Sequence, residues 1–397
     1  MLPNKTPIDN SDRLLKFLLH FGFLASGTVT VLIGQILPIL SNRLALNDTQ
    51  AGYFFIAQFF GSITGTFLTQ PIVRRFGFGG ATVFGFLAMM IGVLGLNSDD
   101  WIFCLAAFVV TGFGIGITLP SINMLTVELN PSNVTPALNF LNFFWGVGAI
   151  FCKPFIDLFG TPTSIFQPTA ILAVLLFVNG ITIFFASRRS EPRQSFEQTE
   201  SKNYTPIWTT ATAWLIALFN FIHVGFESGI GGWITTYAAR LPNQSDGFLW
   251  LSPTFAYFLF FVLGRLVAPI YSRFLHENKM LLLSLLTTTF GVCVLLIGDT
   301  LGILVIGAAI AGFGTSSIFP TNMARFTKTF GATATRRATP LFICGTLGAA
   351  LTTWLIGYIS TNYNDLRFGM IVLLGSCLFL ICLQVFLYAR SRTTVST

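Results

Sequence analysis

The chain has 397 residues, of which 53% are hydrophobic and only 9% charged, and its 22 Lys and Arg against 15 Asp and Glu give a formal net charge of +7. A typical soluble chain is about a quarter charged, so this composition excludes soluble enzymes, nucleic-acid-binding proteins and disordered chains. Apolar stretches of the ~20 residues that cross a bilayer recur along the sequence, which excludes a single membrane anchor. The composition therefore predicts a multi-pass protein embedded in the lipid bilayer.

Twelve apolar spans are predicted along the chain. Most basic residues fall in the N-terminal segment and in every second loop, whereas the alternate loops carry acidic residues such as Asp99, Asp299 and Asp365. The positive-inside rule then places both termini in the cytoplasm of a protein of the cell (inner) membrane. The predicted spans are residues 14–40, 50–70, 80–96, 101–126, 136–158, 167–186, 209–239, 249–271, 279–298, 301–322, 339–360 and 366–388.

A polar stretch and an internal repeat divide the chain into two halves. Residues 187–205 form the longest polar stretch, and we predict a cytoplasmic linker there between six-helix bundles at 1–186 and 206–397. Three short motifs recur at offsets of 198 to 200 residues, which is typical of transporters built from two related halves. The pairs are Gly112-Phe-Gly114 with Pro120 and Gly312-Phe-Gly314 with Pro320, Pro71-Ile72 and Pro269-Ile270, and Asn123-Met124 and Asn322-Met323.

Twelve spans, a central polar loop and basic turns after spans 2 and 8 resemble the major facilitator superfamily. Within it, residues 112–123 (GFGIGITLPSIN), 139–148 (NFLNFFWGVG) and 225–233 (GFESGIGGW) are similar to the fucose, galactose and glucose symporters related to fucose permease. The resemblance implies an all-α fold of two pseudo-symmetric six-helix bundles and transport of a monosaccharide with protons. The chain departs from these patterns at two places. The loop after span 2, residues 73–77, has no acidic residue before its basic pair, and Leu119 stands where the fucose-permease group has a carboxylate.

One face of the seventh span carries the strongest candidates for coupling. Asn220, His223 and Glu227 are spaced i, i+3 and i+7 and so share a helical face. Ionisable groups inside a membrane are costly to keep and mark functional sites. We predict proton coupling through Glu227 with Arg265 of span 8. The alternatives are a static hydrogen bond between helices for Glu227 and snorkelling towards the cytoplasm for Arg265.

The same span continues into a glycine cluster and an aromatic residue. Gly229, Gly231 and Gly232 predict a bent or unwound segment that lines a cavity. Trp233 follows directly and offers a flat face on which a sugar ring can stack. An interfacial aromatic belt is the alternative role for this tryptophan.

Amide and aromatic side chains in other spans are the remaining candidates for sugar binding. An amide donates and accepts hydrogen bonds, as sugar hydroxyls require, although it can equally bond between helices. The substrate-binding set comprises Gln35, Asn123, Asn139, Asn142, Trp145, Asn220, His223, Trp233, Asn322 and Trp354. The cytoplasmic gating set comprises Arg74, Arg75, Glu128 and Arg273.

Several other chemistries lack their motifs. There is no GxxxxGK phosphate loop, no HExxH and no GxSxG, and His20, His223 and His276 are far apart. Gly112, Gly114 and Gly116 form GxGxG inside an apolar span, which indicates close helix packing and not dinucleotide binding. We therefore expect no enzymatic activity, no metal and no cofactor, and a monomer whose partners are a sugar, protons and lipid. A lipophile exporter, a passive sugar facilitator and a transporter-like receptor remain alternatives.

Overall fold

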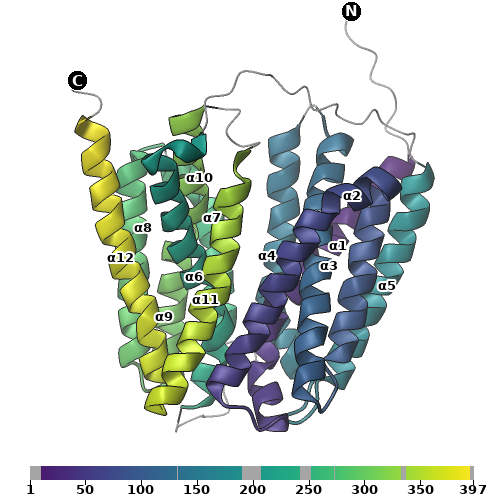
Figure 1. Cartoon of the computed structure of the whole chain (residues 1–397), viewed down its shortest axis with the longest axis horizontal. Coiled ribbons are helices and arrows are strands. Elements are labelled where there is room, and N and C mark those ends of the chain that lie inside the picture. Colours follow the sequence, from purple (N-terminus) through teal and green to yellow (C-terminus); the bar gives the residue numbers. More distant parts are fainter. Residues whose placement is uncertain are drawn as a thin grey trace, which may run out of the picture. The chain divides into compact units, whose positions relative to one another are not determined.

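The computed structural model describes residues 10–131, 133–189, 207–241, 252–271, 273–331 and 337–393, and Figure 1 shows their helices. Side-chain caps begin several of them: Asp100 accepts from the Phe103 amide at 2.7 Å, and Thr210 caps the Ala213 amide. The helices are α1 (Asn10–Arg43), α2 (Asp48–Gly95), α3 (Trp101–Leu129), α4 (Val134–Phe159), α5 (Phe166–Arg189), the short 3-10 helix η1 (Ile207–Thr209), α6 (Ala211–Ala239), α7 (Pro253–Tyr271), α8 (Glu277–Ile297), α9 (Leu301–Thr315), α10 (Ile318–Phe330), α11 (Thr339–Tyr363) and α12 (Leu366–Thr393).

The predicted all-α membrane fold is confirmed. Within the described ranges, 11 helical stretches are long and apolar enough to cross a bilayer. The difference from twelve arises because spans 50–70 and 80–96 lie in one helix, α2, where we expected a separating turn. The helix runs through Arg74 and Arg75 and kinks at Gly77, whose φ of 71° and ψ of 174° suit glycine alone. The chain therefore changes direction at the kink within α2 and not in a separate turn.

The predicted span 301–322 is also interrupted. Helix α9 ends at Thr315 and α10 begins at Ile318, with Ser316 and Ser317 between them. The two pieces together still form one stretch of membrane-spanning length, Leu301–Phe330. Discontinuous helices of this kind expose backbone carbonyls inside a membrane protein, where side chains must satisfy them.

By their contacts the helices divide into two compact units. The first comprises Met1–Thr30, Phe60–Ala149 and Phe166–Lys202, and the second comprises Val31–Phe59, Ile150–Ile165 and Asn203–Thr397, each over its described residues. The second unit thus contains the C-terminal parts of α1 and α4 and the N-terminal part of α2. Residues 190–205 of the predicted linker lie outside the described residues, so the boundaries at 187 and 205 stay a prediction.

Glycines allow close helix packing in both units. In the first, a Cβ on Gly116 of α3 would lie 2.1 Å from the Ser62 carbonyl oxygen of α2, which matches the packing role predicted for the GxGxG run. In the second, a Cβ on Gly312 of α9 would lie 2.2 Å from the Tyr257 carbonyl oxygen of α7. These contacts leave no room for any larger residue at either glycine.

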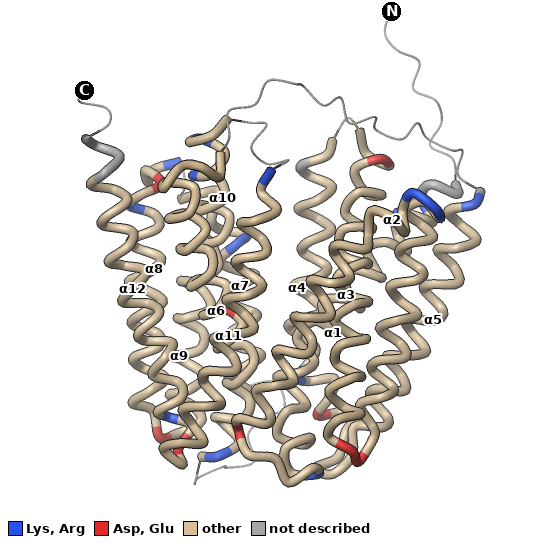
Figure 2. Tube along the Cα trace, in the orientation of Figure 1, with Lys and Arg blue, Asp and Glu red and all other residues tan. Residues whose placement is uncertain are grey.

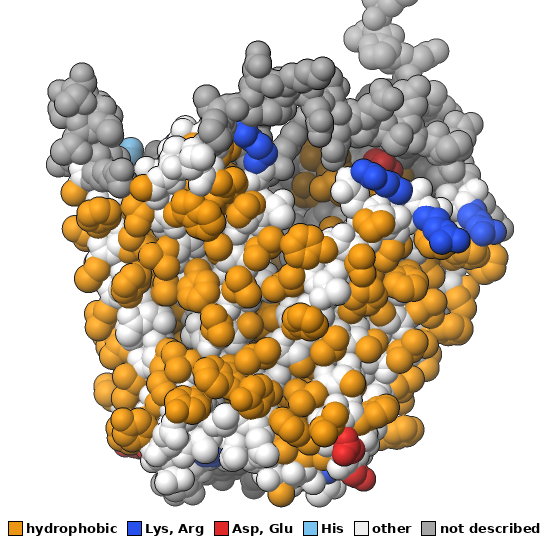
Figure 3. Space-filling view, in the orientation of Figure 1, with side chains coloured by type: hydrophobic (Ala, Val, Ile, Leu, Met, Phe, Trp, Pro, Cys, Tyr) orange, Lys and Arg blue, Asp and Glu red, His pale blue; other side chains and the backbone are white. Residues whose placement is uncertain are grey.

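Apolar side chains cover the outward faces of the helices, as Figure 3 shows for one face. Phe60, Ile102, Phe274 and Phe290 are each more than 60% exposed, an arrangement that hydrocarbon tolerates and water does not. In Figure 2 the Lys, Arg, Asp and Glu residues gather towards the helix ends, and the middle parts of the helices are almost free of them. The few charged groups inside the helices therefore call for explanation.

Candidate functional site

Helix α6 brings a histidine and a carboxylate together one turn apart. His223 Nε2 lies 3.5 Å from Glu227 Oε2, as the predicted shared face requires. The histidine is fully buried, whereas the Glu227 side chain is 24% exposed. Neither ring nitrogen of His223 has a hydrogen-bond partner among the described residues. The pair therefore combines an ionisable carboxylate with a buried imidazole whose Nε2 faces it and whose Nδ1 has no hydrogen-bond partner among the described residues.

Helix α7 supplies a cation to this pair. The charges of Arg265 and Glu227 interact, and the buried Tyr257 of α7 lies within the influence of both. The guanidinium carbon of Arg265 sits 4.1 Å from the centroid of the Phe261 ring, a cation–π contact. Its Nε also donates to the Ser316 carbonyl at 3.4 Å. We call His223, Glu227, Tyr257 and Arg265 the α6–α7 cluster.

The predicted unwinding of α6 at its glycines is wrong. The helix is continuous from Ala211 to Ala239. The glycines instead admit neighbouring groups: a Cβ on Gly232 would lie 2.6 Å from the Phe55 ring, and a Cβ on Gly34 of α1 would lie 2.5 Å from the Gly231 carbonyl oxygen. Residues of α1 and α2 pack closely at these glycines, and α6 stays unbroken where the sequence predicted that it could unwind.

Two of the predicted sugar-binding residues on α6 are engaged with α11. Asn220 is buried and its Nδ2 donates to the Leu341 carbonyl at 2.9 Å. Trp233 is fully buried, and its Nε1 donates to the Thr353 carbonyl at 2.9 Å. Both bonds fix the rotation of α6 and hence the direction of Glu227. Their role in substrate binding stays a prediction.

Other candidates in the second unit are also engaged between helices. Gln35 of α1 is buried and accepts a hydrogen bond from the Thr235 hydroxyl at 2.8 Å. Asn322 of α10 is buried and donates to the Ile216 carbonyl at 3.4 Å. Trp354 of α11 is half-buried and stacks on Tyr358 at 5.2 Å between ring centroids, while its Nε1 lacks a hydrogen-bond partner among the described residues. Trp354 is thus the one of these three that retains an available donor.

The candidates in the first unit are more open. Asn139 and Asn142 of α4 are exposed, and Asn142 bonds only one turn back, from Nδ2 to the Leu138 carbonyl at 2.8 Å. Trp145 lies half-buried on the same helix. Asn123 of α3 is half-buried and donates to its own helix in the same manner. Asn123 and Asn142 differ from Asn220 and Trp233 of α6 because their amides donate to carbonyls of their own helices.

The four predicted gating residues lie near helix ends. Arg74 and Arg75 are exposed before the kink of α2, and Arg75 lies over the Phe76 ring at 5.3 Å. Glu128 is half-buried in the last turn of α3, and Arg273 is exposed in the turn after α7. Their gating role stays a prediction.

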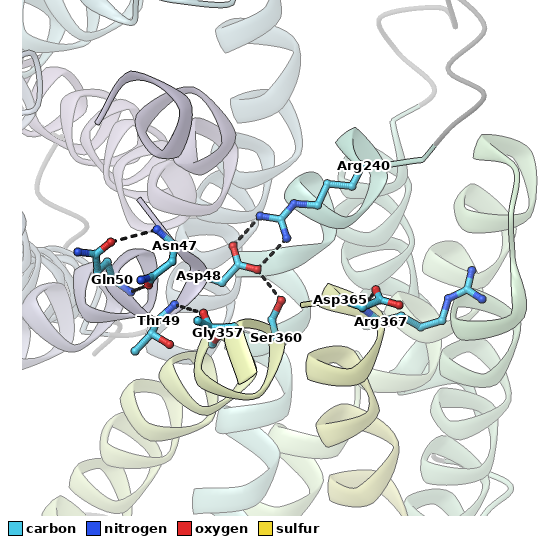
Figure 4. Close-up of polar contacts among 10 residues, drawn as sticks. Asn47, Asp48, Thr49, Gln50, Arg240, Gly357, Ser360, Asp365 and Arg367 are labelled. Carbon is cyan, nitrogen blue, oxygen red and sulfur yellow. Dashed lines mark hydrogen bonds and ion pairs between the residues drawn. The ribbon is translucent and has the colours of Figure 1, made fainter. Parts of the chain in front are cut away.

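A second polar cluster lies where α2 begins, and the sequence did not single it out (Figure 4). Asp48, which is 7% exposed, accepts both arms of the Arg240 guanidinium, at 2.7 and 2.5 Å, in a bidentate pair. The Ser360 hydroxyl of α11 also donates to Asp48, and the Thr361 hydroxyl accepts from the Thr49 amide at 2.9 Å. We call these contacts the Asp48 cluster.

Sequence reasoning missed Asp48 because it stands at the edge of an apolar span, where an acidic residue reads as an ordinary helix start. It missed Tyr257 because a single tyrosine within an apolar span does not show which residues of other helices lie beside it. A signal for the latter was present: Tyr257, Phe261 and Arg265 are spaced i, i+4 and i+8 along one face of α7. No group of three or more His, Cys, Asp or Glu able to hold a metal occurs among the described residues.

Comparisons with known proteins match this arrangement to one family. Residues 19–335 match the sequence model of the Major Facilitator Superfamily. The chain is 22% identical over 351 residues to the sodium-dependent glucose transporter 1 of Xenopus laevis, which covers 80% of this chain and 69% of that protein.

Solved structures show the same fold at low identity. A D-xylose-proton symporter aligns with a TM-score of 0.74 at 13% identity, over 93% of this chain and 97% of its own. The transporter FucP, in an outward conformation, aligns with a TM-score of 0.62 at 16% identity, over 95% and 99%. The nucleoside transporter NupG aligns with a TM-score of 0.73 at 13% identity, over 96% and 99%.

Proposed function

The chain belongs to the Major Facilitator Superfamily, as its sequence indicated, and on that premise we propose that it moves a monosaccharide across the membrane together with protons. The observation that carries the proposal is the α6–α7 cluster, in which Glu227 lies 3.5 Å from His223 and interacts with the charge of Arg265. Keeping ionisable groups inside a membrane helix bundle costs free energy, so a carboxylate and a cation there indicate a functional site. Among the described groups, this cluster best combines a titrating acid with a partner that can compete for it.

Glu227 is the proposed coupling group. When Glu227 is ionised, the charge of Arg265 stabilises its carboxylate. When Glu227 is protonated, it no longer needs the cation and can lie among uncharged groups. A helix movement that separates the two groups would therefore favour protonation, and one that joins them would release the proton. Proton binding and helix position are coupled through this one contact.

The proposed sugar ligands are the amides of α4. Asn139 and Asn142 are exposed on a helix that must cross a membrane, and an amide facing hydrocarbon would leave its donors and acceptors unsatisfied. An aqueous pathway satisfies them, and a sugar hydroxyl can replace that water. Trp145 on the same helix offers an aromatic face on which a sugar ring can stack. The name of the Xenopus laevis relative, a glucose transporter, supports a sugar.

We further propose that the Asp48 cluster is the outer gate of alternating access, on the side opposite the predicted cytoplasmic gate of Arg74, Arg75, Glu128 and Arg273. The bidentate Asp48–Arg240 pair and the Ser360 bond join the start of α2 to α6 and α11. A cysteine pair at Thr49 and Thr361, whose amide and hydroxyl are 2.9 Å apart, tests this. Oxidation of the Thr49→Cys/Thr361→Cys protein should stop transport reversibly, with reduction and each single variant as controls; full transport by the cross-linked protein would refute it.

The test of the main proposal is uptake of labelled hexoses, pentoses and a lipophilic cation into proteoliposomes, with an imposed proton gradient, a sodium gradient or none. We expect one sugar to accumulate when protons drive it. Glu227→Gln should abolish that accumulation while equilibrium exchange continues. Glu277→Gln is the matched control, because that carboxylate pairs with Lys328 outside the α6–α7 cluster.

Other outcomes of this assay select the alternatives. Sugar that only equilibrates would indicate a passive facilitator. Accumulation driven by a sodium gradient and not by a proton gradient would mean that sodium is the coupling ion, as the name of the Xenopus laevis relative suggests. Movement of the lipophilic cation alone would favour an exporter. Proton-driven accumulation that survives in Glu227→Gln would refute the role of this carboxylate.

A further inference from the structure

Arg367, at the start of α12, bonds to three different neighbours. Its Nη2 donates to Asp299 Oδ1 at 2.5 Å, its Nε donates to the Tyr237 hydroxyl at 3.2 Å, and its backbone amide donates to Asp365 Oδ1 at 2.8 Å. The Asp299 side chain is 75% exposed, and an exposed ion pair contributes little to stability. Tyr237 is buried, and a buried hydroxyl requires a hydrogen-bond partner. The bond to Tyr237 is therefore the contact of Arg367 that burial makes important.

Tyr237 lies in the last turn of α6, next to the residue that pairs with Asp48. Helix α6 ends at Ala239, so Arg240 is the first residue beyond it. The Arg240 amide donates to the Tyr237 carbonyl at 3.3 Å, one turn back. Terminal turns of helices open more easily than their middle parts. The cation of the Asp48 cluster therefore stands on a backbone that needs support, and Tyr237 is the residue through which support reaches it.

The turn between α11 and α12 joins Arg367 back to Asp48. The Asp365 amide donates to the Ser360 carbonyl at 3.2 Å, and the Ser360 hydroxyl donates to Asp48. The contacts thus form a closed ring within the second compact unit, and Figure 4 shows part of it. In order around the ring, its members are Asp48, Arg240, Tyr237, Arg367, Asp365 and Ser360.

The two arginines of this ring have different partners. Arg240 binds Asp48 of α2 directly, and this pair separates when the proposed outer gate opens. In the described part of the chain, Arg367 bonds to Tyr237, Asp299 and Asp365, none of which belongs to α2. Its bonds therefore do not depend on the position of α2. A group that is already ordered loses less conformational entropy when it binds, so Arg367 favours the pair without touching Asp48.

We infer that Arg367 is a positioning residue of the outer gate: through the Tyr237 hydroxyl it holds the last turn of α6, so that Arg240 is in place when Asp48 closes on it. This inference rests on the proposed gate role of the Asp48 cluster. Arg367 acts through Tyr237 and Arg240, and not on substrate or proton.

The test is Tyr237→Phe, with Asp299→Asn as the matched control. Phenylalanine keeps the buried ring and removes only the hydroxyl to which Arg367 donates. Asparagine removes the charge at the exposed end of Arg367 and leaves the bond to Tyr237. Each change is combined with Thr361→Cys, and the added thiol is labelled with a polar maleimide in lipid nanodiscs, where the reagent reaches both sides of the membrane.

The thiol of Thr361→Cys reports the open gate, because the start of α2 lies against this position through the Thr49 amide when the gate is closed. We expect Tyr237→Phe to speed its labelling roughly tenfold, the factor that corresponds to fixing the backbone of about one residue. Asp299→Asn should change the rate by less than about twofold. The protein without Thr361→Cys gives the background from the six native cysteines. An unchanged rate in Tyr237→Phe, or an equal rise in Asp299→Asn, would overturn the inference.

A double-mutant cycle separates positioning from a general structural effect. In the Arg240→Gln background the gate lacks the cation that Tyr237 positions, so Tyr237→Phe should cause no further change in the labelling rate. A further rise in that background would show that the hydroxyl supports the fold and not Arg240, and would overturn the inference. Thermal unfolding in detergent checks that the compared proteins are folded. Arg367→Leu, which removes the donor in place of the acceptor, repeats the test if Tyr237→Phe does not fold.

The outcome remains distinct from that of the proposed gate. If oxidation of Thr49→Cys/Thr361→Cys stops transport but Tyr237→Phe is labelled at the parent rate, the gate stands and the positioning role falls. If the cross-linked protein transports fully, the gate falls, and the positioning role falls with it.

Discussion

The contact between α6 and α11 allows a sharp test of how the α6–α7 cluster is held. Gly348 of α11 faces the backbone of α6, and a Cβ placed there would lie 1.9 Å from the Phe221 carbonyl oxygen. Carbon and oxygen normally approach to about 3.3 Å, so Gly348→Ala would have to move the helices apart by about 1.4 Å. Backbone atoms cannot rotate away as a side chain can.

The matched control is Gly375→Ala in α12, where nothing lies within 4 Å of an added Cβ. Both changes gain the same helix preference of alanine over glycine, about 1 kcal/mol. Overpacking costs typically 1–3 kcal/mol, and a backbone clash belongs at the upper end. We expect Gly348→Ala to be roughly 2 kcal/mol less stable than the parent and about 3 kcal/mol less stable than Gly375→Ala.

Thermal unfolding of the detergent-solubilised protein, followed by tryptophan fluorescence, measures this difference. A unit of this size shifts its Tm by about 2–4 °C per kcal/mol, so the two variants should differ by roughly 6–12 °C. Transport should fall as well in Gly348→Ala, because His223 and Glu227 move with α6. Equal Tm values for the two variants would show that the helices are not held at this contact.

Three further changes test other contacts by the same unfolding assay. Asn220→Leu should cost about 1–3 kcal/mol because the buried Leu341 carbonyl loses its donor; an unchanged Tm would mean that another group replaces the amide. Trp233→Phe should cost about 1–3 kcal/mol because the buried Thr353 carbonyl loses its indole donor, and a larger loss would indicate repacking of the ring. Gly77→Ala should cost about 1–3 kcal/mol from its positive φ, whereas Gly302→Ala, where a Cβ meets nothing within 4 Å, should not.

Sequence reasoning predicted the fold well because hydropathy is local. Spans of apolar residues and their flanking charges identify membrane helices without knowledge of their neighbours, and the repeat of Pro120 and Pro320 indicated related halves. It failed at α2 and α6, where the decision was not local. Arg74 and Arg75 suggested a turn, yet Gly77 allowed a kinked continuous helix, and Gly232 suggested unwinding, yet the Phe55 ring packs against it.

The site was predictable in part. Spacing alone placed His223 and Glu227 on one face, and the structure brings them within 3.5 Å. Spacing could not tell that Asn220 and Trp233 bond to carbonyls of α11, since those acceptors are more than 100 residues away. An amide that binds a substrate and an amide that joins two helices have the same residue type and the same position on a helix.

The sequence by itself determined that this protein lies in a lipid bilayer, and it identified the ionisable residues within the apolar spans. Few charges, long apolar spans and a carboxylate inside the seventh span follow from composition and order alone. The tertiary structure alone decided the partners: Arg265 with the Ser316 carbonyl, and Asp48 with Arg240 and Ser360. The physical reason is that burial depends on local hydropathy, whereas a hydrogen bond depends on two groups from distant parts of the chain meeting at about 3 Å.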